Sequence, residues 1–182
     1  TIKNNSVVDV NVPKLSVGFD AGKRANTVYD NRMGVIDDTF CVVCKEKSNA
    51  CNGHFGSIKL HEPVVNPLFI KYAVQYLRIF CLQCCRLLHK GNDGKTIDKK
   101  KIEKVEVCPH CDESQPKITL DNSTVKLQYK NSNPFHMTAV DIYNIFDRIL
   151  EVDIKVLGLN EKNHPRNLVL NYFPVAPIKT RP

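Results

Sequence analysis

The 182-residue chain has no apolar run approaching the 18 or more residues that a membrane-spanning helix requires. Its N-terminus, Thr1-Ile2-Lys3-Asn4-Asn5, lacks the basic and then apolar pattern of a secretory signal peptide. No low-complexity tract occurs, and no internal repeat apart from short cysteine pairs. The sequence therefore contains nothing that argues for a membrane span, for secretion or for a repeat architecture. It also starts without Met and stops at Arg181-Pro182, so we expect a fragment of a longer protein.

The overall composition is that of a globular protein with a basic surface. Hydrophobic residues make up 42% of the chain, which is enough to supply a core. The length corresponds to one domain, or one domain with a small satellite. Lys and Arg number 26 against 19 Asp and Glu, a formal net charge of +7. This charge permits contact with nucleic acid but does not demonstrate it.

The eight cysteines are the most informative feature, because they fall into pairs with one spacing. The pairs are Cys41-x-x-Cys44, Cys51-x-x-His54, Cys81-x-x-Cys84-Cys85 and Cys108-x-x-Cys111. Two ligands on a tight turn bring their atoms to one point, as a tetrahedral zinc ion requires, whereas a disulfide between such close residues is strained. The pattern predicts two zinc sites with eight ligands: Cys41, Cys44, Cys51, His54, Cys81, Cys84, Cys108 and Cys111. Cys85 is then the spare thiol.

Two pairings of these half-sites are possible. Sequential pairing places the first two pairs on one ion and the last two on the other, whereas cross-brace pairing, as in RING domains, alternates them. Only residues 45–50 separate Cys44 from Cys51, and so short a loop closes on one ion at little entropic cost. The spacing therefore favours sequential pairing. Because ligand cysteines bind as thiolates, two bound zinc ions would lower the net charge to about +4.

The remaining sequence predicts a mixed α+β fold with short strands, hairpins and a few helices. Residues 1–26 read as an arm or edge strand, and 57–60 as a short strand before a turn bracketed by Pro63 and Pro67. Residues 67–80 predict a helix that buries one face, and 117–120 with 125–129 predict a hairpin. A helix is predicted to follow Thr138, which caps it together with Asp141. A second short helix is predicted to end at Gly158. Residues 168–173 predict a strand, and the proline-containing end an extended segment. The two predicted buried faces comprise Leu68, Phe69, Tyr72, Ala73, Tyr76, Leu77 and Phe80, and Val140, Ile142, Ile145, Phe146, Ile149 and Leu150.

The densest run of basic residues lies between the two halves of the second predicted zinc site. It admits two interpretations: a solvated excursion between ligands, or a surface that faces phosphates. The second interpretation makes the following residues candidate nucleic-acid contacts: Arg86, Lys95, Lys99, Lys100, Lys101 and Lys104.

One long stretch resembles a known family. Residues 30–37, Asp-Asn-Arg-Met-Gly-Val-Ile-Asp, precede Cys41-x-x-Cys44 and Cys51-Asn52-Gly53-His54-Phe55-Gly56. This order is similar to the N-terminus of the largest subunit of multisubunit DNA-directed RNA polymerase, of the archaeal, eukaryotic or large-DNA-virus type. The later cysteine pairs, Gln115-Pro116-Lys117-Ile118, residues 145–159 and the closing Pro174-Val175-Ala176-Pro177 follow the family's order over about residues 27–182. The sequence departs from the family pattern at Asn52 and Cys85, where the family often has Pro and Gly. Its short excursion and many Asn and Lys residues hint at a viral enzyme.

The resemblance implies a role in transcription. In that family this region forms much of the clamp, a mobile wall that closes over DNA and the RNA–DNA hybrid. The expected fold is therefore an irregular, zinc-stapled α+β clamp, with residues 1–26 as an arm and 27–182 as the clamp region. The latter divides into a first zinc module (27–66), a helix with the second zinc module (67–116), and a hairpin, helices and closing strand (117–182). The expected partners are DNA, the hybrid and other polymerase subunits, notably the second-largest. The resemblance also implies an intracellular location, the nucleus or, for a viral enzyme, the cytoplasm or virion.

The catalytic centre is not expected here. The family holds its catalytic Mg²⁺ with an Asp-rich motif much later in the subunit, and no such cluster of carboxylates occurs in this chain. The whole subunit would belong to a nucleotidyltransferase, with no catalytic residue in this segment. Three other classes compete: a stand-alone zinc-ribbon-like transcription factor, a RING-like ubiquitin ligase and a catalytic zinc enzyme. The last needs an open coordination position, whereas both predicted sites are fully ligated.

Overall fold

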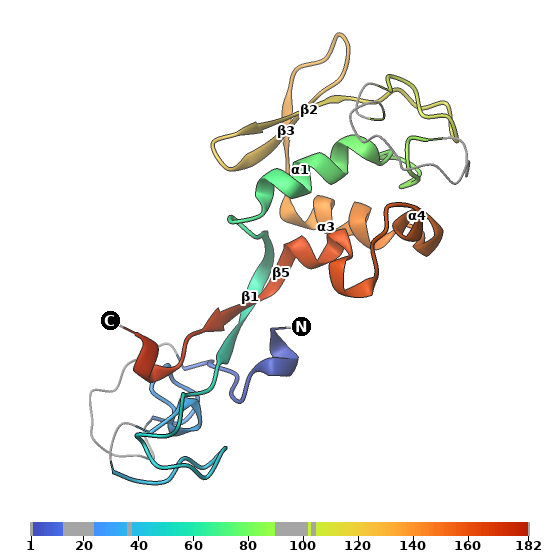
Figure 1. Cartoon of the computed structure of the whole chain (residues 1–182). Coiled ribbons are helices and arrows are strands. Elements are labelled where there is room, and N and C mark those ends of the chain that lie inside the picture. The colour runs from blue at the N-terminus through green and yellow to red at the C-terminus, as the bar shows by residue number, and fades with distance from the viewer. Residues whose placement is uncertain (1, 13–23, 36–37, 90–101, 103–104, 182) are drawn as a thin grey trace. The chain divides into compact units, whose positions relative to one another are not determined.

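The computed structural model describes residues 2–12, 24–35, 38–89, 102 and 105–181. They form a mixed α+β fold with short helices and small sheets, which confirms the α+β part of the predicted fold class (Figure 1). The strands are β1 (Gly56–Val65), β2 (Lys117–Asp121), β3 (Thr124–Gln128), β4 (Phe135–Met137) and β5 (Val169–Val175). The α-helices are α1 (Ile70–Ile79), α3 (Ala139–Asp147) and α4 (Glu151–Val156). Short 3-10 helices are η1 (Lys3–Asn5), η3 (Asn31–Met33), η4 (Glu161–Asn163), η5 (Pro165–Leu168) and η6 (Ile178–Thr180). No helix among these residues has the length and apolarity needed to cross a membrane.

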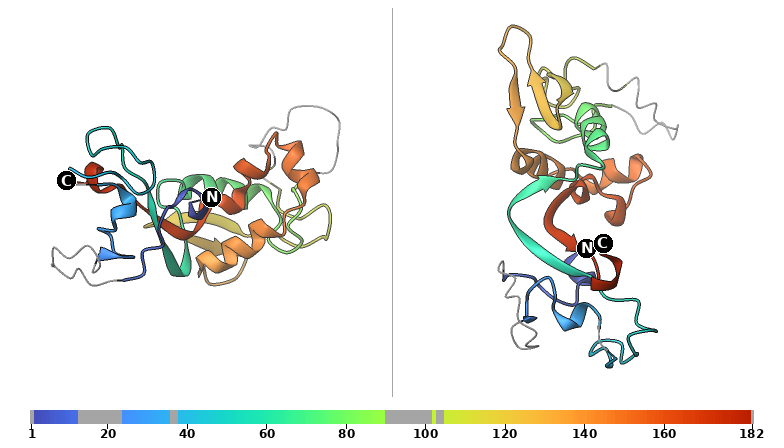
Figure 2. Two further views of the ribbon diagram at one scale, coloured as in Figure 1. Left: turned by 90° about the horizontal axis from the view of Figure 1, so that it is seen from below. Right: turned by 90° about the vertical axis from the view of Figure 1, so that its left-hand side faces the viewer.

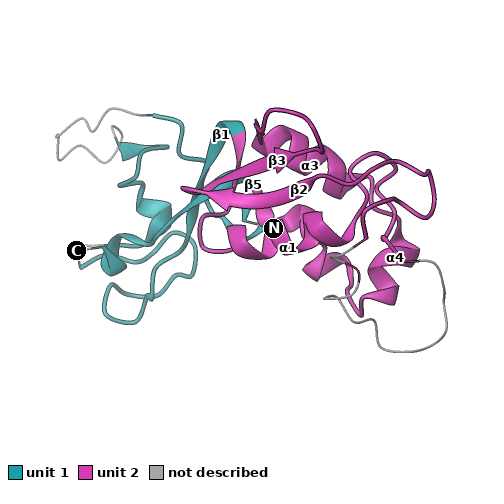
Figure 3. Ribbon diagram, turned by 90° about the horizontal axis from the view of Figure 1, so that it is seen from above, with its two compact units in different colours: residues 1–62, 171–182 teal, residues 63–170 magenta. Residues whose placement is uncertain are grey.

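The chain divides into two compact units (Figure 3). Unit 1 comprises Thr1–Glu62 together with Asn171–Pro182, and unit 2 comprises Pro63–Leu170. Strands β1 and β5 form a two-stranded sheet (Figure 2), and β2, β3 and β4 form an antiparallel sheet in that order.

Unit 2 is built on an apolar core around helix α1. The helix contacts β2 and η5, and in Figure 1 it lies between the β2–β3 hairpin and α3. Four of its five buried residues, Ile70, Ala73, Val74 and Leu77, recur at steps of three and four, which places them on one face of the helix. The fifth, Ile79, is the last residue of the helix. Ile118 and Val125 from the hairpin and Phe146 from α3 join the same core.

The buried faces of the two long helices were predicted only in part. In the first helix Ala73, Leu77 and Phe80 are buried, but Leu68, Phe69 and Tyr72 are exposed. The helix begins at Ile70 and not at Pro67, because the Asn66 side chain and carbonyl accept the amides of Leu68 and Phe69 and close a turn.

The helix after Thr138 shows the same mixture of confirmed and wrong predictions. The reciprocal cap between Thr138 and Asp141 forms as predicted, with the Asp141 amide 3.1 Å from the Thr138 hydroxyl. Ile142, Phe146 and Ile149 are buried, whereas Val140 and Leu150 are exposed. These two sit just inside and just past the helix ends, where the periodicity of a helix no longer decides which side chains face the core.

Two further predictions about prolines are wrong. Pro63 lies inside β1 and not at a turn, which is tolerated because both strands of a two-stranded sheet have a free edge that needs no donor. The C-terminal segment is not extended throughout, since Ile178–Thr180 forms helix η6. The hairpin, the helix ending near Gly158 and the strand near residues 168–173 are confirmed, with β5 reaching Val175.

Unit 1 has a smaller core, assembled from segments far apart in sequence. Val8 and Val10 pack with Met33 and Val175. The N-terminal segment runs parallel to the start of β1: the Val10 amide donates to the Ser57 carbonyl (2.7 Å), and the Ser57 amide donates to Val8 (3.0 Å). Among the described residues, the predicted edge strand is therefore reduced to one parallel bridge, between Asp9 and Ser57.

Candidate metal centres

The eight predicted ligands gather into two groups. Cys41, Cys44, Cys51 and His54 form the first group, in unit 1, and Cys81, Cys84, Cys108 and Cys111 form the second group, in unit 2. Within each group the ligand atoms all lie within 4.8 Å of one another. This is the sequential arrangement that the short loop between Cys44 and Cys51 favours.

The spacing of the ligand atoms fits a tetrahedral ion. Two sulfur pairs of the second group, Cys81–Cys111 and Cys84–Cys108, are each 3.7 Å apart. A metal with sulfur ligands at about 2.3 Å gives a tetrahedron whose edges are about 3.8 Å, whereas a disulfide would require about 2.05 Å. All eight cysteines are free thiols. The donor set and its dimensions therefore suit zinc and exclude disulfides within these pairs.

The Cys41–Cys44 turn shows how the backbone positions a pair of ligands. The Lys45 amide donates to the Cys41 carbonyl (2.9 Å), and the Cys41 amide donates to the Glu46 carbonyl (2.8 Å). The Val43 amide points at the Cys41 sulfur from 3.4 Å. These bonds hold a tight turn and aim backbone dipoles at a sulfur that must carry negative charge when it binds a metal.

Both turns of the second group repeat this pattern. The amides of Cys85 and Asp112 donate to Cys81 and Cys108, at 3.0 Å in each case. The amides of Cys81 and Cys108 donate onward to Arg86 (2.9 Å) and Glu113 (2.8 Å).

The residue that follows the second cysteine takes a left-handed conformation in all three turns. The φ angles are 63° at Lys45, 57° at Cys85 and 57° at Asp112. This conformation favours glycine, which gives a physical reason for the glycine that the family often has where Cys85 stands. Cys85 is fully buried and lies outside both ligand groups.

The fourth turn, from Cys51 to His54, is built differently. Gly53 has a φ of 84°, and its amide approaches the Cys51 sulfur at 3.4 Å. A side chain at Gly53 would collide with Pro177, and Lys179 donates to the Cys51 carbonyl (2.9 Å). The turn is therefore held by the C-terminal segment of unit 1.

Helix η3 supports the histidine of the first group. The Met33 carbonyl at its end accepts the His54 amide (3.1 Å), and Asp30 caps its start by accepting the Arg32 amide (2.9 Å). Burial alone would raise the pKa of Asp30, but hydrogen bonds from Arg32 and the Asn26 amide outweigh it and lower the pKa. The Asp30-to-Gly34 motif thus acts as a support for the first group.

The second group is attached to helix α4 by a contact that the sequence did not reveal. Arg86 Nε lies 2.7 Å from Asp153 Oδ2, and the same oxygen accepts the Leu87 amide (3.3 Å). The Asp153 side chain is 8% exposed. Because 66 residues separate Arg86 from Asp153, no local pattern could have predicted this pair.

Without a cation the clustered thiols compete for negative charge. Burial disfavours ionised Cys41, but the amides of Cys44 and Val43 and neighbouring thiols lower its pKa to about 6. Burial and neighbouring thiols raise the pKa of Cys84 to about 12. A divalent cation would allow all four ligands of a group to bind at neutral pH.

Most of the predicted nucleic-acid contacts lie outside the residues that the structure describes. Arg86 is described: its guanidinium pairs with Asp153, and 36% of its side chain is exposed. Lys95, Lys99, Lys100, Lys101 and Lys104 lie outside the described residues. A contact between these side chains and nucleic acid stays a prediction.

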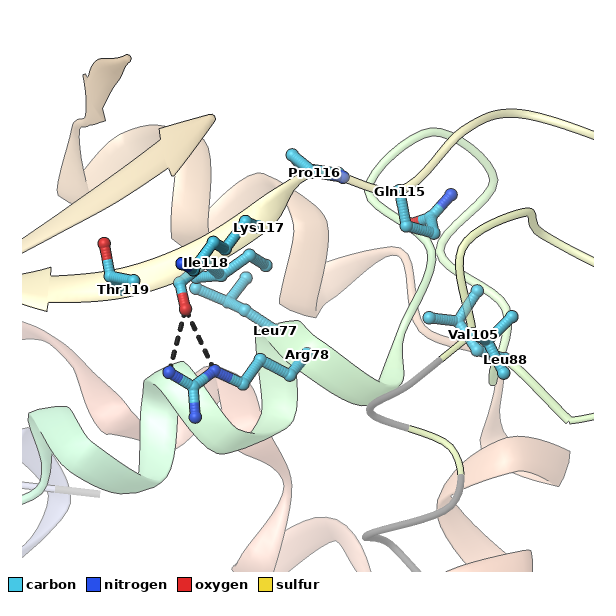
Figure 4. A pocket seen from close by; sticks show the side chains of 9 residues that line it. All are labelled: Leu77, Arg78, Leu88, Val105, Gln115, Pro116, Lys117, Ile118 and Thr119. Atoms are coloured by element: carbon cyan, nitrogen blue, oxygen red, sulfur yellow. Dashed lines mark hydrogen bonds between the residues drawn. The ribbon is translucent and has the colours of Figure 1, made fainter. Parts of the chain in front are cut away.

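A pocket of about 240 Å³ opens in unit 2 between helix α1 and strand β2 (Figure 4). In it Arg78 donates two hydrogen bonds to the Ile118 carbonyl, from Nε (3.0 Å) and Nη2 (2.8 Å). The same carbonyl lies on the strand edge that is not paired with β3. Arg78 therefore supplies hydrogen-bond donors to a strand carbonyl at that edge. None of the predicted metal ligands lines the pocket.

The whole chain matches a known family, described as RNA polymerase Rpb1, domain 1, over residues 1–182. A probable DNA-directed RNA polymerase II subunit RPB1 homolog of Invertebrate iridescent virus 6 is 30% identical and aligns with all of this chain and 20% of its own length. The DNA-directed RNA polymerase subunit Rpo1N of Methanocaldococcus jannaschii is 31% identical over 85% of this chain and 13% of its own length. The RPB1 homolog of African swine fever virus is 29% identical over 99% of this chain.

The chain thus spans a fifth or less of the length of these relatives. The match nevertheless extends over both ligand groups and over the helices and strands that support them. This chain belongs to the RNA polymerase Rpb1, domain 1, family, the N-terminal region of the largest subunit of DNA-directed RNA polymerase.

Proposed function

We propose that this chain forms the N-terminal clamp region of the largest subunit of a DNA-dependent RNA polymerase. The observation that carries the proposal is the family match over all 182 residues. A stand-alone zinc-ribbon factor would need only the cysteine turns, whereas the match also covers α1, the hairpin, α3 and β5. The RING-like alternative needs cross-brace pairing, and the ligands group sequentially.

We propose that each ligand group holds one structural zinc ion. Four donors already surround each position, so no open coordination site remains for a water or a substrate. A bound zinc ion would neutralise the clustered thiolates in each group and, in the first group, would fix a segment that has little apolar core of its own. Catalytic zinc chemistry is disfavoured on the same ground.

The proposed contribution to RNA synthesis is mechanical. The Mg²⁺ of nucleotidyl transfer would be held elsewhere in the subunit, and this segment would help to enclose DNA and the RNA–DNA hybrid. Residues 1–26 would act as an arm and 27–182 as the clamp proper, in contact with the second-largest subunit, inside a cell or virus-infected cell. A wall that moves as one body must be stiff, and metal-stapled turns supply that stiffness.

The test of this function uses the complete subunit in its native source. An affinity tag on the subunit that carries this sequence should recover the second-largest polymerase subunit, and the purified assembly should make RNA on a DNA template. Recovery of the tagged chain without polymerase subunits would refute the proposal and favour a stand-alone factor.

The proposed grip on DNA is through phosphates, because a polymerase must move over any sequence. Charge reversal of Lys99, Lys100 and Lys101 to Glu should weaken retention of nonspecific DNA by the assembled enzyme. Three lost phosphate contacts should also reduce the slope of log binding constant against log salt concentration by about 3. An unchanged slope would count against this surface.

Metal content tests the zinc proposal separately. Native mass spectrometry of the purified chain should find two zinc ions. Because Cys85 is fully buried and the other cysteines are ligands, thiol titration should find no fast-reacting cysteine while zinc is bound, and eight once a chelator and a denaturant are added. A chain without metal and without free thiols would contain disulfides, and the zinc proposal would fail.

A further inference from the structure

The side chain of Gln115 makes three hydrogen bonds at the second group. Its Nε2 donates to the Cys81 sulfur (3.4 Å) and to the Glu113 carbonyl (2.9 Å), and its Oε1 accepts the Leu82 amide (3.4 Å). The amide nitrogen faces acceptors and the amide oxygen faces a donor, so the orientation of the side chain is fixed by its partners. Figure 4 shows Gln115 directly before Pro116 and strand β2.

These partners belong to different halves of the group. Cys81 and Leu82 lie in the first turn of the second group. The Glu113 carbonyl also accepts the Cys108 amide (2.8 Å), so it is part of the second turn. The Gln115 backbone is held in turn, because its amide donates to the Glu106 carbonyl (2.8 Å). The side chain therefore links the two half-sites without being a metal ligand.

The second group has more need of such a link than the first. Six residues separate the half-sites of the first group, from Cys44 to Cys51, whereas 23 separate Cys84 from Cys108. Since the probability of loop closure falls as about the 3/2 power of length, closing the longer loop is less favourable by a factor of roughly seven. Among the described residues, the first group's sulfurs have backbone amides, one another and the His54 ring as hydrogen-bond partners, and not an amide side chain.

We propose that Gln115 is a positioning residue that keeps the two halves of the second group together and slows the release of its zinc ion. The N–H donated to the Cys81 sulfur stabilises the thiolate that binds the metal, and the other two bonds resist separation of the turns. The inference rests on the zinc ions of the proposed function.

The experiment compares the purified full chain with two variants. Gln115→Met keeps the length of the side chain but removes all three bonds. Gln115→Glu keeps the acceptor for the Leu82 amide but replaces the donating nitrogen by oxygen. Gln83→Leu is the matched control, because Gln83 is exposed at the tip of the same turn and its contacts there are made by the backbone: its amide donates to the Cys81 sulfur and its carbonyl accepts Arg148. Gln115 is half-buried, so neither variant opens a cavity.

The chain is loaded with ¹¹³Cd, whose nuclear resonance separates a four-sulfur site from a three-sulfur, one-nitrogen site, and release to a chelator is followed for each resonance. Loss of a supporting hydrogen bond around a metal site typically costs 10- to 100-fold in affinity. We expect both Gln115 variants to release cadmium from the four-sulfur site about tenfold faster or more, with the other site unchanged. Native mass spectrometry repeats the comparison with zinc.

Three results would overturn the inference. These are release from the four-sulfur site within twofold of the parent chain, equal acceleration at both sites, and the same acceleration in Gln83→Leu. If Gln115→Met does not fold, the Gln115→Glu variant decides alone, because it keeps one of the three bonds and the same shape. A parent chain that binds no zinc would instead overturn the zinc proposal, so the two failures can be distinguished.

Discussion

The two ligand groups are built from similar C-x-x-C turns, but they differ in the amount of buried apolar core beside them. In the first group the four ligands fall within 14 residues, and the buried apolar cluster around them comprises, among the described residues, Val35, Cys41 and Cys51. In the second group they span 31 residues, and Cys81, Cys85 and Cys108 belong to the large core of unit 2. Loss of metal from the first group should therefore unfold the surrounding region, whereas loss of metal from the second group should unfold only one edge of unit 2.

The largest expected effect comes from removing one thiolate from each group. Apparent zinc-binding free energies of structural sites are about 10–16 kcal/mol, and most of this is lost with one ligand. We expect Cys44→Ser to release one zinc ion and to unfold residues 38–55. Cys84→Ser should also release one zinc ion, but α1 and α3 should stay folded on their apolar faces. Hydrogen exchange by mass spectrometry, with metal content measured in parallel, checks both outcomes.

The control for this pair is Cys85→Ser, which touches the second group but removes no predicted ligand. It should retain two zinc ions. Full zinc content and unchanged exchange protection in Cys44→Ser would contradict a structural role for the first site. Complete unfolding of α1 in Cys84→Ser would show that the core of unit 2 is less independent than its burial indicates.

The next effect concerns the contacts that attach each group to its unit. Asp153→Ala should destabilise unit 2 by about 2–3 kcal/mol, because it leaves the buried Leu87 amide unsatisfied while Arg86 can still reach water. Lys179→Met, which removes the bond to the Cys51 carbonyl in unit 1, should cost about 1 kcal/mol or less. Urea unfolding monitored separately for each unit measures the difference. Equal losses would mean that the two groups are attached equally firmly.

The left-handed turn residues allow a smaller comparison with opposite signs. Asp112 and Cys85 have the same φ, but Asp112 is exposed and Cys85 is fully buried. Asp112→Gly should stabilise the chain by about 0.5 kcal/mol, because relief of the left-handed strain exceeds the added entropy of the unfolded chain. Cys85→Gly should destabilise by about 1 kcal/mol, because the lost buried side chain outweighs the same relief. Thermal unfolding of both zinc-loaded variants shows whether each substitution stabilises or destabilises the chain. Two shifts in the same direction would mean that burial of the side chain does not decide the outcome.

Local sequence patterns predicted the features that depend on a few neighbouring residues. The C-x-x-C spacing marked the turns because the turn itself is closed by bonds between residues four and five apart. The Thr138 cap and the β2–β3 hairpin were predictable for the same reason. Helix α1 was placed correctly but started late, since Asn66 competes for the first amides.

Contacts between distant segments were not predictable from such patterns. Asp153 is an ordinary acidic residue of a short helix by sequence, and only the fold brings it to Arg86. Gly53 is a glycine because Pro177, 124 residues later, occupies the space beside it. Strand β4 was missed since three residues are too few for a periodic signal. The functional prediction came from the resemblance to polymerase subunits, because the spacing of the cysteines alone does not indicate a function.

The smallest expected effect compares the buried titratable side chains of the two units. In unit 2, His164 is 7% exposed and its Nδ1 accepts the Arg166 amide (3.2 Å), which requires the neutral imidazole. Burial, with a smaller contribution from Arg166, lowers its pKa below 6.5, and Asp147 and Glu161 oppose this shift only partly. In unit 1 the titratable group is Asp30, whose pKa is lowered from 3.8.

The sign of the pH dependence follows from these two directions. The unfolded state binds a proton at His164 before the folded state does, so unit 2 should keep its full stability above about pH 6.5 and lose stability as the pH falls further. The stabilisation from Asp30 should persist until the pH falls below about 4, so Asp30 should add no pH dependence to unit 1 in the same window. Unfolding midpoints between pH 7.5 and 5.5, with zinc content checked at each pH, measure this difference. His164→Asn keeps a capping side chain without titrating and should flatten the response of unit 2. An unchanged slope in that variant would contradict the assignment of this pH dependence to His164.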